Sequence, residues 1–164
     1  MEISISRLSE DNWKKYREIR LEALRNEPTA FSSSYEEQKD FEDAVWRSRI
    51  KYALFALTPE KNPVGLVTII FYSSEKIKHK VDIIQVYVKP AYRRKGIAGK
   101  LFDEALRIVK NNKDVIKINI AVNPEQIPAV RLYKSFGFKK IGSLSKELCI
   151  EGTYYDEDVM ELII

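Results

Sequence analysis

The stretch "VYVKPAYRRKGIAGKLFDEALRIVK", residues 86–110, decides the fold, because it places a strand, a glycine turn and a helix directly after one another. Its β-branched start is typical of a strand. Its end predicts a helix over residues 97–111, since apolar residues recur there at every third and fourth position. Between the two lies a basic turn that contains Gly96 and Gly99. This order indicates a mixed α/β protein.

The turn has the chemistry of a pyrophosphate site. A helix N-terminus presents free backbone N–H groups and the positive end of the helix dipole, so it attracts anions. Gly96 and Gly99 allow the backbone to approach a phosphate closely, because no Cβ stands in the way. Four cations add positive charge at the turn: Arg93, Arg94, Lys95 and Lys100. A plain solvated turn is the alternative interpretation.

The rest of the chain alternates between strand and helix patterns. We expect strands over residues 2–8, 52–58, 64–72, 79–89, 115–122, 138–148 and 154–164. We expect helices from a cap at Ser9 or Asp11 to about Arg25, over 35–50, over 97–111, and over 124–136, where Gly137 ends the last one. The 164 residues show no repeat and no linker. The sequence therefore predicts one mixed α/β (α+β) domain, residues 1–164, in the order βααβββαβαββ.

The composition excludes several classes of protein. No apolar run approaches the roughly 20 residues that span a bilayer, and "MEISISRLSE" lacks the basic flank and apolar core of a signal peptide. Cys149 is the single cysteine, so we expect a packing role for it, no intrachain disulfide and a cytoplasmic location. His79, the one histidine, lies among lysines and is expected to be exposed; no metal-ligand spacing occurs. The net charge of +4 is too small and dispersed to indicate nucleic-acid binding.

Two motifs narrow the identity of the anion. The turn lacks the Gly-Lys-Ser/Thr ending of a Walker loop, and "GIAGKL" lacks the three-glycine spacing of a dinucleotide site. It does fit the pattern R-x-x-G-x-A, with Arg93, Gly96 and Ala98. After the next strand comes "AVNPEQIPAVRLYKSFGFKKIG", residues 121–142. With these two motifs at this separation, nearly the whole chain resembles the GCN5-related N-acetyltransferase (GNAT) superfamily.

The resemblance implies the GNAT fold, a central twisted sheet that is mixed but mostly antiparallel and flanked by helices, with acetyl-CoA as co-substrate. In this family the strand before the loop carries a bulge and splays from the next strand. The pantetheine arm pairs there with backbone groups, here those of Val86 and Val88, with Tyr87 between them. The pyrophosphate would be held by the loop amides of Arg94, Lys95, Gly96, Ile97, Ala98, Gly99 and Lys100.

The resemblance also assigns side-chain roles. Asn123 would hydrogen-bond the pantetheine, Tyr133 would stand near the thioester sulfur as general acid, and Lys134 would lie near the nucleotide. The half-buried aromatic of a short helix is the alternative interpretation of Tyr133. The family usually transfers the acyl group directly, without an acyl-enzyme.

The reaction needs a neutral amine, and therefore a general base. An amine with a lysine-like pKa of about 10.4 is neutral only about once in 2,500 molecules at pH 7. Asp82 is the candidate, because it stands where some family members carry a catalytic glutamate; its shorter side chain favours relay through water. In an unbroken strand Asp82 shares a face with Ile84, Val86 and Val88. An ordinary strand-edge carboxylate is the alternative interpretation.

Two acidic islands bear on the acceptor. Residues 35–43 hold five acids and one lysine, and residues 151–161 hold five acids and no base. The resemblance places both segments beside the acceptor groove, so a polyamine such as spermidine or spermine is the expected small-molecule partner. A protein N-terminus or a lysine is the alternative acceptor, and solvated surface is the alternative interpretation of the islands. A non-catalytic acyl-CoA-binding module is the alternative function, and either a monomer or a homodimer is expected.

Overall fold

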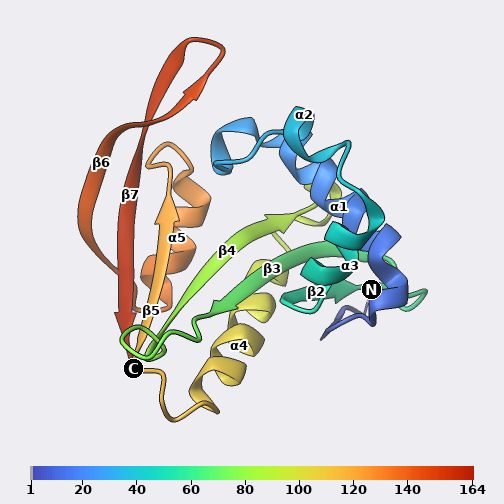
Figure 1. Cartoon of the computed structure of the whole chain (residues 1–164), viewed down its shortest axis with the longest axis horizontal. Helices are drawn as coiled ribbons and strands as arrows, with labels where there is room; N and C mark the ends of the chain where they lie inside the picture. The colour runs from blue at the N-terminus through green and yellow to red at the C-terminus, as the bar shows by residue number, and fades with distance from the viewer. Residues whose placement is uncertain (1) are drawn as a thin grey trace.

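A computed structural model describes residues 2–164 of the chain. Seven strands form one sheet in the order β1-β2-β3-β4-β5-β7-β6, and every neighbouring pair is antiparallel except β4–β5 (Figure 1). The strands are β1 (Ser4–Ser6), β2 (Ala53–Leu57), β3 (Pro63–Phe71), β4 (Lys80–Val88), β5 (Lys117–Val122), β6 (Lys139–Ile150) and β7 (Thr153–Ile163). The helices are α1 (Trp13–Asn26), α2 (Tyr35–Gln38), α3 (Asp43–Ile50), α4 (Ile97–Lys110) and α5 (Ile127–Ser135). The predicted fold class is confirmed.

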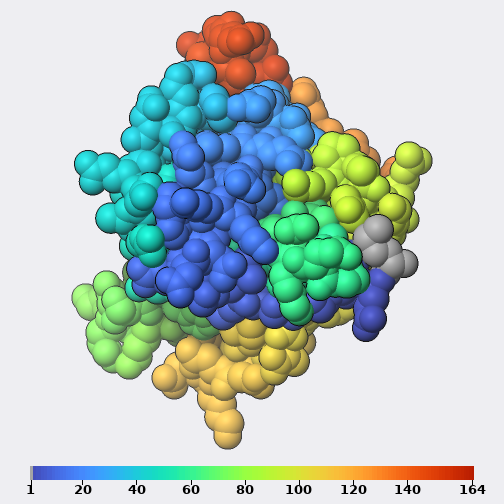
Figure 2. Space-filling model, turned by 90° about the vertical axis from the view of Figure 1, so that its right-hand side faces the viewer, coloured from blue at the N-terminus to red at the C-terminus, as the bar shows by residue number. Residues whose placement is uncertain are grey.

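Helices pack on both faces of the sheet (Figure 1). On one face α4 and α5 bury a core around Phe102, whose ring lies 5.3 Å from that of Tyr133. On the other face α1 and α3 bury a second core, in which Tyr16 meets Trp46 edge to face at 5.6 Å. The long hairpin of β6 and β7 extends beyond the rest of the sheet (Figure 1), and its tip projects above the residues around α2 in Figure 2. Among residues 2–164, no helix combines the length and apolar character that crossing a bilayer requires.

Two expected helix details are wrong. Residues 35–50 form two helices, because the chain turns after α2 and the ring of Phe41 packs against Trp46 at 5.8 Å. Glu42 is extended there and precedes α3. Neither Ser9 nor Asp11 caps α1, which Asn12 precedes. The Ser9 hydroxyl accepts a hydrogen bond from Asn12, in a 3₁₀ turn (Glu10–Asn12) before the helix.

A β-bulge interrupts β4. Gln85 has a left-handed φ of 58°, and the pairing with β3 shifts register there. Beyond the bulge Val86 and Val88 pack against the α4–α5 core, whereas Tyr87 belongs to the α1–α3 core. Before the bulge it is Ile83 that belongs to the α4–α5 core, so Asp82 faces the other way. Because β4 is not an unbroken strand, Asp82 does not share a face with Val86 and Val88: the extra residue inverts the alternation.

The same bulge opens the sheet. Strands β4 and β5 are paired only at Lys80–Asp82 with Lys117–Asn119. Beyond these residues β4 bends away from β5 (Figure 1), while β5 stays paired with β7 as far as Val122. The result is a split in the middle of the sheet that points toward the start of α4.

Candidate functional site

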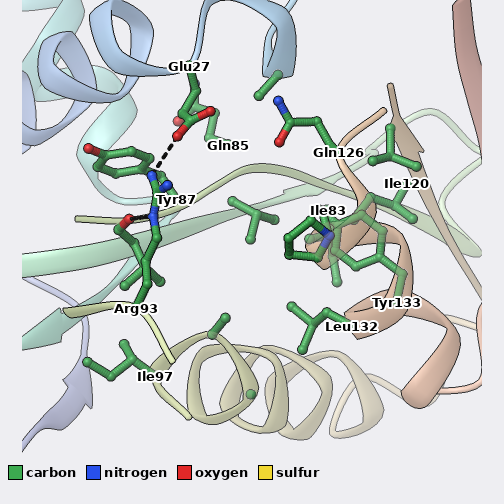
Figure 3. Close-up of a pocket in the computed structure, with 18 of the residues that line it drawn as sticks. Glu27, Ile83, Gln85, Tyr87, Arg93, Ile97, Ile120, Gln126, Leu132 and Tyr133 are labelled. Carbon is green, nitrogen blue, oxygen red and sulfur yellow. Dashed lines mark hydrogen bonds and ion pairs between the residues drawn. The ribbon is translucent and has the colours of Figure 1, made fainter. Parts of the chain in front are cut away.

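A cavity of about 890 Å³ lies where β4 and β5 separate (Figure 3). Its walls come from the ends of β4 and β5, the first turn of α4, the inner side of α5, and the segment between α1 and α2. The structure brings most of the predicted site residues to these walls: Val86, Tyr87, Val88, Arg93, Arg94, Gly96, Ile97, Ala98, Gly99, Asn123 and Tyr133. Four predicted residues are not among the lining residues: Asp82, Lys95, Lys100 and Lys134.

The first turn of α4 forms one end of the cavity. Gly96 precedes the helix with a left-handed φ of 74°, a conformation that favours glycine. A Cβ built at Gly96 or at Gly99 would meet no atom within 4 Å, so the space before the backbone is open. The Lys100 amide donates to the Gly96 carbonyl at 3.1 Å and is therefore already used. The amides of the preceding residues remain at the helix N-terminus, where an anion is favoured.

The predicted cations differ in their positions. Arg94 lines the cavity. The Lys95 ammonium donates to the Ala91 carbonyl at 3.0 Å. Lys134 is exposed on α5, where it adds to the effect of Lys140 and Ser143 in lowering the pKa of Asp158. The structure thus places Lys134 toward β7 rather than beside the α4 turn.

Tyr133 stands at the opposite end of the cavity, on α5 (Figure 3). Its side chain is 4% exposed and packs between Phe102 and Phe138. Burial raises the pKa of the phenol, so the hydroxyl keeps its proton at neutral pH. A buried protonated phenol that borders a cavity is a suitable donor to an anion that forms there.

Asn123 closes the β5 side of the site. Its side-chain carbonyl accepts from the Glu125 amide at 2.9 Å, and its amide nitrogen donates to the Thr29 carbonyl at 3.3 Å. The neighbouring Gln126 donates to the Thr29 hydroxyl at 3.1 Å. The structure therefore connects Asn123 to the segment between α1 and α2.

Asp82 lies one strand position outside the cavity, which begins at Ile83. Its carboxylate accepts hydrogen bonds from the Tyr72 hydroxyl and, at 3.0 Å, from the Asn119 amide. The hydrogen bond that Tyr72 donates to Asp82 raises the pKa of the Tyr72 phenol. Asp82 shares the face of Ile84, which lines the cavity and is 40% exposed.

The family resemblance implies that the segment joining the first two helices flanks the acceptor groove, but it names no individual residue of this α1–α2 wall. Glu27, Ala30 and Phe31 line the cavity, although "NEPTAF" shows only a helix break. Sequence reasoning also missed Gln85, whose side-chain carbonyl accepts from Tyr16 at 3.1 Å and Thr68 at 2.9 Å. Contacts between segments so far apart in the sequence leave no local pattern.

Comparisons with known proteins agree with this geometry. A family model described as "Acetyltransferase (GNAT) family" matches residues 13–138. An N-alpha-acetyltransferase of Saccharolobus solfataricus is 34% identical over 38% of this chain and 37% of its own length. A spermidine N(1)-acetyltransferase of Vibrio cholerae is 32% identical over 63% of this chain and 58% of its own length. The matched part thus spans less than two thirds of these relatives.

Solved structures show the same fold along the whole chain. A GNAT-family acetyltransferase from Streptococcus pneumoniae superposes with a TM-score of 0.87 at 19% identity, covering 99% of this chain and 100% of that one. Arabidopsis thaliana NAA60 in complex with acetyl-CoA superposes with a TM-score of 0.76 at 19% identity, covering 99% of each chain.

Proposed function

The chain belongs to the acetyltransferase (GNAT) family, and we propose that it transfers an acetyl group from acetyl-CoA to a primary amine. One observation carries the proposal: the split between β4 and β5 joins an anion-binding helix N-terminus to a buried phenol in a single cavity. An acyl-CoA needs these two ends, because it carries a pyrophosphate and a thioester at opposite ends of a thin arm.

The described residues fit acetyl-CoA. The open space before Gly96 and Gly99 and the free amides of the first α4 turn suit the pyrophosphate. β5 does not pair with β4 from Val86 to Val88, so the backbone groups of this edge suit the pantetheine amides, apart from the Val88 carbonyl, which accepts from Arg93 Nε. The thioester supplies an activated acetyl group when acetyl-CoA is bound. The amine nitrogen then bonds to the acetyl carbon, the carbon–sulfur bond breaks, and Tyr133 donates its proton to the departing sulfur.

The amine must lose a proton before it can attack. Asp82 does not line the cavity, so it serves as the base through water that enters along the Ile84 face of β4. A water chain that ends at Asp82 brings a proton acceptor within reach of the amine.

The proposed acceptor is a polyamine, with spermidine as the test compound. The first acidic island offers little support, because Glu37 accepts from the Ser34 amide in a capping box and Glu36 pairs with Lys39. In the second island Glu157 supports the proposal. It lies two residues along β7 from Val159, which pairs with the cavity residue Ala121, so Glu157 lies on the same face of the sheet as Val159 and Ala121.

The environment of Glu157 suits a distal ammonium group. Burial, followed by the nearby Glu147, raises the pKa of the Glu157 carboxyl. A cation placed near the two carboxylates would relieve their repulsion and lower the pKa of the Glu157 carboxyl. The similarity to a spermidine N(1)-acetyltransferase points in the same direction, whereas the similarity to an N-alpha-acetyltransferase favours a protein N-terminus as the second candidate.

The test measures thiol release from acetyl-CoA with spermidine, a basic N-terminal peptide and a neutral primary amine, at low and high salt. We expect spermidine to have the highest kcat/KM and a KM that rises with salt. Glu157→Gln should raise the KM for spermidine and leave that for the neutral amine unchanged, with the exposed Glu151→Gln as control. A higher kcat/KM for the peptide than for spermidine would make a protein N-terminus the proposed acceptor. Acetyl-CoA binding without thiol release from any amine would favour the non-catalytic module.

A further inference from the structure

The segment Glu27–Phe31, here called the strap, forms the wall of the cavity that comes from the connection between α1 and α2. It runs from the end of α1 through a 3₁₀ turn (Pro28–Ala30), and Glu27, Ala30 and Phe31 all line the cavity. It is held at two points by elements that also line the cavity. Asn123 and Gln126 bind Thr29 from the β5–α5 turn. Arg93 binds Glu27 from the turn before α4.

The Arg93 side chain is aimed at the strap. One terminal nitrogen, Nη2, lies 2.6 Å from Glu27 Oε1, and Nε donates to the Val88 carbonyl at 2.9 Å. Figure 3 shows the guanidinium extending toward Glu27 and Tyr87, away from Ile97 at the start of α4. A residue of the phosphate-loop motif thus reaches across the end of β4 to the last turn of α1.

The end of α1 is itself fixed to β4 beside this contact. The Tyr87 hydroxyl donates to Glu22 at 3.0 Å and accepts from Asn26 at 3.0 Å. Glu22 also pairs with Lys89 at 2.9 Å. The point where the strap leaves α1 is therefore anchored, so the Arg93–Glu27 pair can determine how the strap continues over the cavity.

We propose that Arg93 is a positioning residue that holds the acceptor-side strap through Glu27, and that its guanidinium is not a ligand of the acetyl-CoA phosphates. The inference rests on the proposed function. The phosphates then depend on the α4 amides and on Arg94, whereas the motif arginine couples the loop to the wall that receives the amine.

The alternative role for Arg93 predicts opposite effects. If Arg93 were a phosphate ligand, Glu27 would compete with the phosphates for it, and Glu27→Gln would tighten acetyl-CoA binding. If Glu27 instead attracted a cationic amine directly, removal of the Arg93 charge would lower the KM for spermidine. Under our proposal both substitutions raise the KM for the amine and leave acetyl-CoA binding unchanged.

The experiment compares Glu27→Gln, Arg93→Gln and the double variant in the full chain. Gln at position 93 keeps an N–H donor at the place of Nε, so the bond to Val88 can persist while the contact with Glu27 is lost. Glu18→Gln is the matched control, since Glu18 is exposed on α1 and forms no ion pair within residues 2–164. Calorimetry gives the Kd for acetyl-CoA, and thiol release gives the KM for spermidine, or for the best amine of the panel.

We expect each single variant to raise the KM for the amine about 2- to 5-fold, the range of a partly exposed ion pair. The double variant should show no larger increase than the more affected single variant, because the two residues act through one contact. The Kd for acetyl-CoA should change less than 2-fold in all three. Arg94→Ala, by contrast, should weaken acetyl-CoA binding.

Three results would overturn the inference: weaker acetyl-CoA binding by Arg93→Gln, tighter binding by Glu27→Gln, or additive effects on the KM. Calorimetry requires no turnover, so these outcomes are separable from failure of the proposed function. A wild-type protein that transfers acetyl to no amine would defeat the proposed function. A wild-type enzyme that turns over while Arg93→Gln loses acetyl-CoA affinity would defeat only the role given to Arg93.

Discussion

Replacing Gly96 by glutamate should abolish acetyl-CoA binding and leave the protein folded. The new side chain would enter the open space before the first turn of α4, where a Cβ meets no atom within 4 Å. It would not disturb the core, because Gly96 is exposed. The substitution therefore separates the binding of the anion from the stability of the fold.

The two magnitudes follow from the geometry. The left-handed φ of 74° costs a non-glycine residue roughly 1–2 kcal/mol, a modest part of a typical stability of about 5–15 kcal/mol. A carboxylate about 4 Å from a phosphate repels it by about 4 kcal/mol at an effective dielectric constant of about 20. Because about 1.4 kcal/mol corresponds to a factor of ten, the affinity should fall by roughly three orders of magnitude.

Calorimetry with acetyl-CoA and urea denaturation test both numbers. Gly142→Glu is the control, because a Cβ there also meets open space and the residue lies outside the cavity. Gly99→Ala is a second comparison: it should stabilise α4 by up to about 1 kcal/mol and still weaken acetyl-CoA binding. Wild-type affinity in a folded Gly96→Glu protein would refute the assignment of the pyrophosphate to this turn.

Three further predictions concern single side chains. Tyr133→Phe should lower kcat about 10- to 100-fold with little change in the KM for acetyl-CoA. Burial raises the phenol pKa above its ordinary value of about 10, so loss of the Tyr133 proton should not lower the wild-type kcat at any pH up to about 10. Asp82→Asn should lower kcat, because the carboxylate is the proposed base, whereas unchanged kcat would make Asp82 a structural acceptor for Tyr72. Arg20→Met should leave the free energy of unfolding unchanged or raise it by up to about 2 kcal/mol in urea denaturation. The reason is that Arg20 is 2% exposed and burial lowers its pKa to about 10. A loss above about 2 kcal/mol would show that the hydrogen bond to Gln38 outweighs the cost of the buried charge.

Local pattern was sufficient for most of the fold. Helix α4 follows from its apolar spacing, which buries Leu101, Phe102 and Ala105 against the sheet. Strands β3 and β5 follow from β-branched runs that pack in the same core. The split of residues 35–50 into two helices was not predictable, because it depends on the contact of Phe41 with Trp46 rather than on a glycine or proline.

The bulge at Gln85 shows most clearly where predicting strand faces from a two-residue period fails. A strict two-residue period places Asp82 and Val86 on one face, yet the left-handed Gln85 inverts the order between them. Two buried hydroxyls, those of Tyr16 and Thr68, hold the Gln85 side chain in place. Those donors lie on α1 and β3, so the strained residue is stabilised by contacts that β4 alone does not reveal.

The two halves of the candidate site differ in how far their contacts reach along the chain. The anion-binding end needs only a strand, a turn and a helix in succession, and residues 86–110 contain all three. The acceptor side depends on Glu27 meeting Arg93 across 66 positions and on Thr29 meeting Asn123 across 94. A local motif therefore predicts the anion-binding end, whereas the strap depends on partners far away in the sequence. We predict that substitutions in the strap and in the β6–β7 hairpin that carries Glu157 change amine preference before they change acetyl-CoA binding.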